Sequence, residues 1–318
     1  MDAAGGAEGA RGFRPKLDRR LSRKRPDVPA SAGREKIKYA FIGLSGNAGA
    51  TALAFAFAEY LASRRNAERR TPLGRRGAGG SSPDSQKAED GMVGRPLDSR
   101  RARDGCAAAV VEINDRNRPP DGFDYDRIGI DKRFAGREYV SFYSLLSKGR
   151  PIRGLANRDG GVNWALRVPG EEYERFEIVD FIRLIDNAVG DTVICDISGS
   201  FGLSLDRDED RIRELRKILD DMDRVCVAVD PLPSAMMADR EKPELFKDYE
   251  SSGGDVVYLL NKFNPGVNLR EVKNFLRVRN FIEIPYFSPA DIYAAEYGCN
   301  TIFSVPAVAE ALSHPFEK

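Results

Sequence analysis

The stretch KIKYAFIGLSGNAGATALAFAFAEYL, residues 36–61, decides the fold of this chain. Its first part, Ile37–Leu44, is a short apolar run with β-branched and aromatic side chains, which predicts a buried strand. The small residues Ser45–Thr51 predict a loop, and the Ala, Leu and Phe residues after them predict a helix to about Ser63. A strand, a glycine-containing loop and a helix in this order direct backbone N–H groups and a helix N-terminus at a phosphate.

The loop keeps the outline of the phosphate-binding pattern G-x-x-x-x-G-K-[ST] but lacks its lysine. Ala50 stands at the lysine position, and Thr51 stands at the hydroxyl position. The missing lysine would place a positive charge on the β- and γ-phosphates, so its loss removes a stabiliser of the transition state. Backbone N–H groups can still bind phosphate without a side chain. The residues expected to contact a phosphate are Gly46, Asn47, Gly49, Ala50, Thr51 and Ala52.

The length and composition of the chain exclude several classes of protein. The chain has 318 residues, 42% hydrophobic and 31% charged, with a formal net charge of +1, enough for one large α/β domain with extra segments or for two small domains. No stretch approaches the ~20 apolar residues of a spanning helix, and the first thirty residues lack the apolar core of a signal peptide. The single histidine and four scattered cysteines argue against a zinc site or a histidine-dependent triad. We therefore expect a soluble, cytoplasmic protein.

Two segments have the composition of disordered chain. Residues 1–35 are rich in Gly, Ala, Arg and Pro, and the chain up to Lys38 has 11 basic and 5 acidic residues, a net charge of +6. We expect a disordered basic arm there, which is either a solvated tail or a tether to nucleic acid or an anionic membrane. Residues 64–105 predict a disordered Arg/Gly-rich insertion on the surface. The remaining chain, 36–318, predicts a single α/β domain around that insertion.

Apolar runs alternate with helical patterns through this domain, which predicts an α/β fold with a mostly parallel sheet covered by helices on both faces. The expected strands, about six, lie at 37–44, 107–113, 192–197, 224–229, 255–260 and 280–285. In such sheets ligands bind beyond the carboxyl ends of the strands. The loops at Ser45–Thr51, Asn114–Asn117, Ser198–Gly202 and Asn261–Phe263 all follow strands, so we expect them to meet at one edge.

Oxygen-bearing side chains at these strand ends suit a magnesium ion. Thr51 and Asp196 offer a hydroxyl and a carboxylate, which are ligands that Mg²⁺ accepts beside a nucleotide. Asp230, at another strand end, is a weaker candidate. Trp164 and Tyr143 fit a hydrophobic core better than a ligand contact.

Each site residue also has a purely structural interpretation. Gly46 and Gly49 would let a strand turn into a helix, and Thr51 would cap that helix. Asp196 would cap a turn, and Asn261 would stabilise its own loop. Their joint placement at strand ends favours the nucleotide site for Gly46, Gly49, Thr51 and Asp196.

These motifs resemble the MinD/ParA branch of P-loop ATPases, whose loop reads K-G-G-x-G-K-T. Ser45–Thr51 keeps the first and third glycines and the threonine of that pattern, while Ser45 and Ala50 replace its two lysines. Val193–Gly199 resembles the Walker B segment, in which an acid precedes a glycine. Asn261-Lys262-Phe263 resembles the strand end whose asparagine contacts the base.

The same resemblance identifies candidates for the water-activating position. The family's second strand ends D-x-D, and the matching residues here are Glu112-Ile113-Asn114 followed by Asp115. Asn114 and Asp115 are thus the weak catalytic candidates, and an asparagine in place of an acid reduces the ability to activate water. The resemblance covers about 36–313 without the insertion. It implies a P-loop NTPase architecture, a site for ATP with Mg²⁺ or for no ligand, and a homodimer formed across nucleotide.

Degenerate loops on MinD-like folds also resemble the bacterial TadZ/CpaE proteins of the Flp pilus machinery, although the receiver-like domain that those proteins often carry is absent here. The resemblance implies a pseudo-ATPase or a very slow Mg²⁺-dependent ATPase. Such a protein acts as a localisation or assembly factor in a pilus or secretion machine, with protein partners that recruit it to the membrane. Two alternatives remain: an active ATPase completed by a partner or by an arginine of the insertion, and a nucleic-acid-associated adaptor that uses the basic arm.

Overall fold

The computed structural model describes residues 36–45, 47–70, 105–113, 123–170, 177–197, 209–238, 242–278 and 280–317. The expected basic arm and most of the expected insertion lie outside these residues. So do Gly46, Asn114, Asp115 and the segment 198–208. What the sequence predicts for these parts of the chain stays a prediction.

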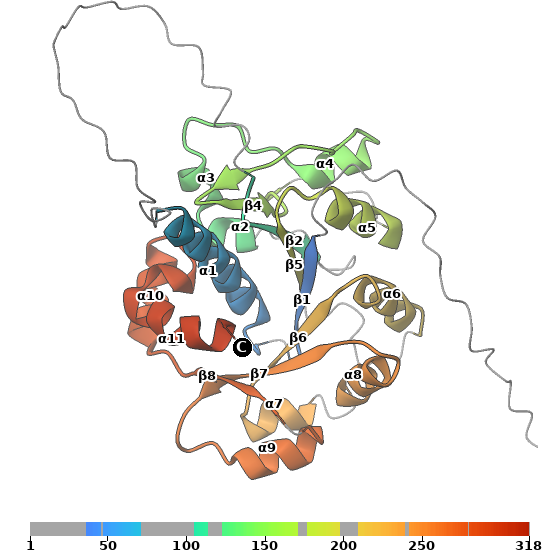
Figure 1. The fold of residues 1–318 in the computed structure, drawn as a ribbon, viewed down its shortest axis with the longest axis vertical. Coiled ribbons are helices and arrows are strands. Elements are labelled where there is room, and N and C mark those ends of the chain that lie inside the picture. Colours follow the sequence, from blue (N-terminus) through green and yellow to red (C-terminus); the bar gives the residue numbers. More distant parts are fainter. Residues whose placement is uncertain are drawn as a thin grey trace, which may run out of the picture. The chain divides into compact units, whose positions relative to one another are not determined.

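The described chain is built on one eight-stranded sheet with the order β3-β4-β2-β5-β1-β6-β7-β8 (Figure 1). All neighbouring strands are parallel except the short β3–β4 pair. The bounds are β1 Ile37–Gly43, β2 Ala108–Ile113, β3 Arg158–Asp159, β4 Val162–Ala165, β5 Thr192–Ile197, β6 Arg224–Val229, β7 Val256–Phe263 and β8 Ile282–Pro285. The predicted fold class is therefore confirmed, and β3 and β4 add to the strands that the apolar runs indicate.

Eleven α-helices and one 3₁₀ helix lie within the described residues. They are α1 Ala50–Arg70, α2 Phe123–Arg127, α3 Ile130–Arg133, α4 Phe142–Ser147, α5 Ile178–Asn187, α6 Glu209–Leu219, α7 Pro233–Ala238, α8 Lys242–Ser251, α9 Leu269–Leu276, α10 Pro289–Tyr297, η2 Ile302–Ser304 and α11 Pro306–Phe316. Side chains alternate between the two faces of a strand, so each face of the buried sheet carries its own hydrophobic core.

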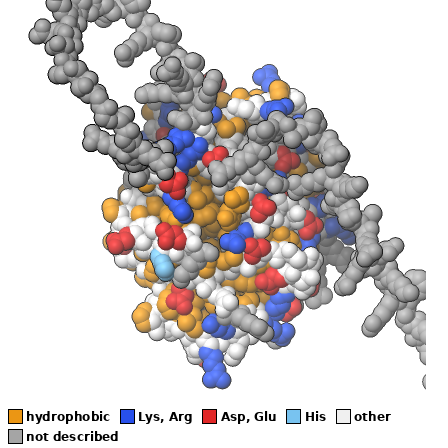
Figure 2. Space-filling model, viewed as in Figure 1, with side chains coloured by type: hydrophobic (Ala, Val, Ile, Leu, Met, Phe, Trp, Pro, Cys, Tyr) orange, Lys and Arg blue, Asp and Glu red, His pale blue; other side chains and the backbone are white. Residues whose placement is uncertain are grey.

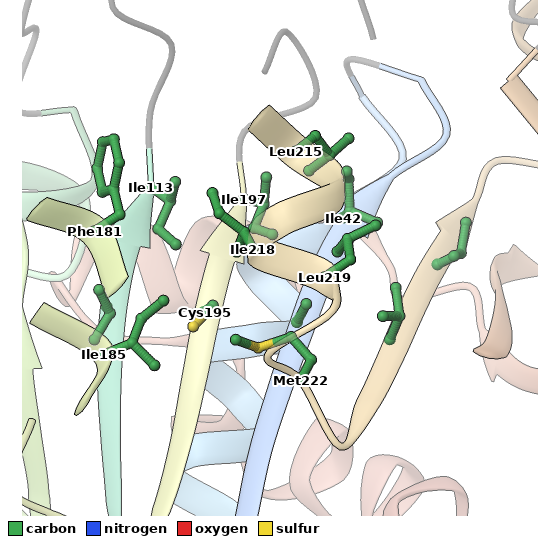
Figure 3. Close-up of a cluster of buried hydrophobic side chains, with 14 of the residues drawn as sticks. Ile42, Ile113, Phe181, Ile185, Cys195, Ile197, Leu215, Ile218, Leu219 and Met222 are labelled. Atoms are coloured by element: carbon green, nitrogen blue, oxygen red, sulfur yellow. The ribbon is translucent and has the colours of Figure 1, made fainter. Parts of the chain in front are cut away.

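Helices cover both faces of the sheet. One core joins the sheet to α1, α10 and α11, and the other joins it to α5, α6, α8 and α9. Figure 3 shows part of the second core, where Phe181 of α5 lies beside Ile113, and Ile218 and Leu219 of α6 lie beside Ile197 and Ile42 on the strands. Because both faces are covered, the carboxyl-terminal edge of the sheet is left for the loops that follow the strands.

The first helix extends beyond its predicted end at Ser63 and continues to Arg70, so the first residues of the predicted insertion are helical. Ala67 is a strong helix former, and Arg64 and Glu68 form an i,i+4 ion pair on the helix surface. The short helices α2 and α3 follow β2 in a segment for which the sequence analysis names no helix.

The residues assigned to the core are buried as predicted. Trp164 and Tyr143 are at most 1% exposed, and Cys195 and Cys226 lie inside strands β5 and β6. Burial raises the pKa of the Cys226 thiol to about 12, so this cysteine behaves as a small apolar side chain. None of the described helices is long and apolar enough to cross a lipid bilayer.

Hydrophobic side chains also gather on the surface, as the orange area of the face drawn in Figure 2 shows. Several large exposed side chains belong to segments that follow the carboxyl ends of β6 and β8: Leu232, Met237, Tyr286, Tyr293 and Tyr297. Leu232 and Tyr286 come within three residues of the carboxyl ends of these strands, the edge at which parallel sheets bind ligands.

Two isoleucines of α6 test the packing of this helix. Ile218 is fully buried and Ile212 is 37% exposed. Ile218→Ala leaves a cavity in the core, so it should lower the free energy of unfolding by about 2–5 kcal/mol. Ile212→Ala should change it by only about 0.5 kcal/mol. Urea denaturation followed by circular dichroism measures both, and equal effects would contradict the assigned orientation of α6.

Candidate functional site

The loop after β1 places a helix N-terminus at the carboxyl edge of the sheet. The Leu44 N–H donates to the Ala228 carbonyl at 2.8 Å, and the Ala48 N–H closes a turn onto the Ser45 carbonyl at 3.1 Å. The helical ladder of α1 starts with the Leu53 N–H and the Gly49 carbonyl, 3.1 Å apart. The N–H groups between Ala50 and Ala52 precede this first rung, so they can bind an anion.

Strand β7 holds the loop from the other side. The Asn261 amide donates to the Ala48 carbonyl at 2.8 Å, and the Lys262 ammonium donates to the Asn47 carbonyl at 2.9 Å. In a trans peptide the N–H points away from the carbonyl, so the Gly49 N–H points away from Asn261. The loop therefore turns carbonyls toward β7 and the Gly49 N–H toward the opposite side.

Lys262 also joins the loop to β6. Its ammonium lies 2.6 Å from Oδ2 of Asp230, which is only 4% exposed, and Oδ1 of Asp230 accepts the Leu232 N–H at 3.0 Å. Lys262 reaches this position with φ at +57°, in the left-handed region. This cation lies beside the loop, but its charge is compensated by a buried carboxylate.

Asp196 and Thr51 meet beneath the start of α1. The Thr51 hydroxyl donates to Oδ1 of Asp196 at 3.1 Å, because β5 pairs directly with β1. Burial raises the pKa of Asp196, and the negative charges of Asp124 and Glu112 add to this rise. The Thr51 hydrogen bond and the positive charge of Arg127 oppose it. A bound cation would relieve the cost of this buried carboxylate.

Glu112, the first residue of the segment that matches the D-x-D strand end, is a second buried acid at this edge. It lies opposite Asp196 in the β2–β5 register, and its Oε2 accepts the Arg167 N–H at 2.9 Å. Within the described residues, no three acidic, histidine or cysteine side chains are close enough together to hold a metal ion. Thr51 and Asp196 fit Mg²⁺ only in the way that nucleotide sites use it, with phosphate and water supplying the other ligands.

A cavity of about 430 Å³ opens beside the first turn of α1. Its volume lies in the range of small-molecule sites, and most of its lining is apolar or aromatic. The lining residues are Gly49, Ala52, Leu53, Arg127, Asn261, Lys262, Pro285, Tyr286, Phe287, Pro289, Ile292, Tyr293, Glu296 and Ile302. Aromatic and apolar walls with an amide at one end suit a nucleobase, and the α1 N-terminus borders the same space.

The predicted site residues that lie within the described part of the chain are brought together by the fold. Asn47, Gly49, Thr51, Asp196 and Asn261 are joined through the loop by the contacts above, and Ala52 lines the cavity. The Ala50 methyl is 8% exposed and packs in the core that includes α1. Asp230 joins the site indirectly, through Lys262.

Two basic residues and one aromatic residue of this site were not predicted from the sequence. Lys262 directly follows Asn261 at a strand end, so its position in the sequence could have identified it as a site residue. Arg127 lies in a segment without clear periodicity, and no motif marks it. Tyr286 follows the last strand, and only the folded cavity shows its place there.

Solved structures show that this arrangement of strands and helices is a known one. The ParA family ATPase from Chlorobium tepidum TLS matches with a TM-score of 0.53 and 13% identity, covering 90% of this chain and 99% of that one. MinD from Pyrococcus horikoshii OT3, complexed with Mg-ADP, matches with a TM-score of 0.55 and 10% identity, covering 89% and 94%.

MinD in the MinC:MinD cell division complex of Aquifex aeolicus gives a TM-score of 0.52 and 11% identity, covering 89% of this chain and 95% of that one. No protein-family model and no curated protein sequence matches this chain. At these identities the likeness concerns the fold, which is that of MinD/ParA P-loop NTPases.

Substitution of Gly49 tests how closely β7 approaches the loop. Its φ is +85°, and a Cβ there would lie 2.4 Å from Nδ2 of Asn261. Gly253 has φ at +97° but open space around it, so it is a matched control. Gly253→Ala should cost about 1–2 kcal/mol for the left-handed backbone. Gly49→Ala should cost about 1–3 kcal/mol more because of the clash.

The two unfolding free energies are compared by urea denaturation. Removing the amide with Asn261→Ala should reduce the extra cost of Gly49→Ala, since the clashing atom is gone. Equal costs for the two glycines would show that β7 does not approach the loop this closely.

Proposed function

We propose that this chain binds a nucleotide with Mg²⁺ through the backbone of the loop before α1, and hydrolyses it slowly or not at all. On this proposal it works as a localisation or assembly factor of the MinD/ParA type, with protein partners. The observation that carries the proposal is the cavity lined by Gly49 and Ala52 at the start of α1, the helix whose first turn holds Thr51 with its hydrogen bond to Asp196.

Three features support a site for the phosphates. Asn261 and Lys262 hold the loop carbonyls, so the loop has its shape before a ligand arrives. The N–H groups at the start of α1 precede the helical ladder, and the helix dipole favours negative charge there. Ser45 adds a buried hydroxyl for which the described residues offer no hydrogen-bond partner.

Magnesium would be held by Thr51 and Asp196 together with the nucleotide. When bound, it would bridge phosphate oxygens and neutralise part of their charge. The chain's own residues orient this site: Thr51 stands in the first turn of α1, and β5 holds Asp196 beneath it. Slow turnover is supported by the absence of a lysine at Ala50 and by the amide at Asn114.

The surface beside the site supports a protein partner or a second copy of this chain. Leu232 and Met237 are 57% and 60% exposed after β6, and Tyr293 and Tyr297 are 58% and 86% exposed on α10. The MinD of Aquifex aeolicus was solved in complex with MinC. A homodimer and a role in pilus or secretion assembly, with recruitment to a membrane by partners, remain part of the proposal, as does binding of nucleic acid through residues 1–35.

Calorimetric titration of ATP with Mg²⁺ tests the proposal. We expect micromolar binding by the unmodified chain, and tighter binding by Ala50→Lys, by about 10- to 100-fold, since a charged hydrogen bond contributes about 1.5–3 kcal/mol. Ala50→Met adds similar bulk without charge and should bring no gain. Absence of binding by the unmodified chain would contradict the proposal, even if Ala50→Lys binds ATP.

Turnover is measured on the same proteins. Fast Mg²⁺-dependent release of phosphate by the unmodified chain, abolished by Asp196→Ala, would contradict the slow or absent hydrolysis proposed here. Ala50→Lys should raise turnover only modestly, because Asn114 still replaces an acid.

A further inference from the structure

Arg127 is a cation at the nucleotide cavity that no sequence motif marks. It ends α2 and lines the cavity together with Gly49 and Ala52. Arg127 and Lys262 are the two basic residues in that lining. Each of them has a carboxylate partner, so what matters for an anion in the cavity is how many of their N–H donors stay available.

The two cations differ in their partners. The Lys262 ammonium lies 2.6 Å from the buried carboxylate of Asp230 and also donates to the loop, so it acts as a brace. Arg127 contacts Glu296 through Nε at 3.5 Å, and that carboxylate is 43% exposed. Across the parts of the chain that the structure describes, Glu296 is the one ionic partner of Arg127. A guanidinium has five N–H donors, and this single contact with Glu296 involves Nε, so its terminal nitrogens can bind an anion.

Arg127 also lies close to the start of α1. It lines the cavity together with Gly49, Ala52 and Leu53, which belong to the loop and to the first turn of that helix. The side chain is only 20% exposed, so water screens this charge less than it would at the surface. Arg127 therefore lies near both the cavity that suits a base and the helix turn that suits phosphates.

We propose that Arg127 binds the phosphates of the nucleotide and supplies the positive charge that Ala50 cannot. This inference rests on the proposed function, because it names a residue of the same site. It differs from a cation donated by the Arg-rich insertion or by a partner, since Arg127 belongs to the folded domain. Arginine suits this role because its planar fork matches phosphate oxygens with two parallel hydrogen bonds.

The test compares Mg²⁺-ATP with adenosine, which has the base and ribose but no phosphate. Arg127→Gln should weaken ATP binding by about 10- to 100-fold, as expected when a charged hydrogen bond is lost. Adenosine binding should change by less than about threefold, a difference of under 1 kcal/mol. Arg137→Gln is the matched control, because Arg137 pairs with Asp159 and does not line the cavity. It should leave both affinities unchanged.

Glu296→Gln separates phosphate binding from a structural ion pair. It removes the Arg127 partner but keeps the guanidinium, so ATP affinity should be retained or should rise. Equal losses of ATP affinity in Glu296→Gln and Arg127→Gln would overturn the proposal, as would unchanged ATP affinity in Arg127→Gln. Equal losses of ATP and adenosine would assign Arg127 to the base and also overturn it. Failure of the unmodified chain to bind ATP would refute the proposed function itself, and this inference with it.

Discussion

The contacts from β7 to the loop before α1 are the constraint on which the site depends. Asn261 and Lys262 bind two successive carbonyls, and Gly49 provides the left-handed backbone that permits this approach. Here the loop is held by side chains of another strand, so its N–H groups are oriented without help from a charge at Ala50. Preorganised backbone donors cost little to use when a ligand binds.

The charged groups around this loop favour a ligand that carries both a cation and an anion. Asp196 is buried beside Thr51, and Glu112 on the neighbouring strand adds a second negative charge. This region favours a cation, whereas the N-terminus of α1 favours an anion. A metal–phosphate ligand satisfies both preferences at once. Arg127 lines the cavity beside the start of α1, and we propose that it compensates part of the charge of such a ligand.

The sequence predicts the sheet and most of the loop site, because both depend on local patterns. Apolar runs mark the parallel strands, and the loop outline marks Gly49 and Thr51. The position of Asp196 beneath Thr51 also follows, since the carboxyl ends of parallel strands meet at one edge. The end of α1 and the short helix carrying Arg127 could not be predicted as well. Arg127 reaches the site through tertiary packing, and no motif marks it in the sequence.

The central claim is that the backbone at the start of α1 binds phosphate without a lysine. Amide chemical shifts of Gly49, Ala50, Thr51 and Ala52, followed by NMR during titration with Mg²⁺-ATP, test it most directly. We predict that these amides shift markedly with ATP and little with adenosine, while residues of the cavity wall such as Ile292 respond to both. If the cavity residues respond to ATP but these four amides do not move, the loop does not bind phosphate and the account is wrong.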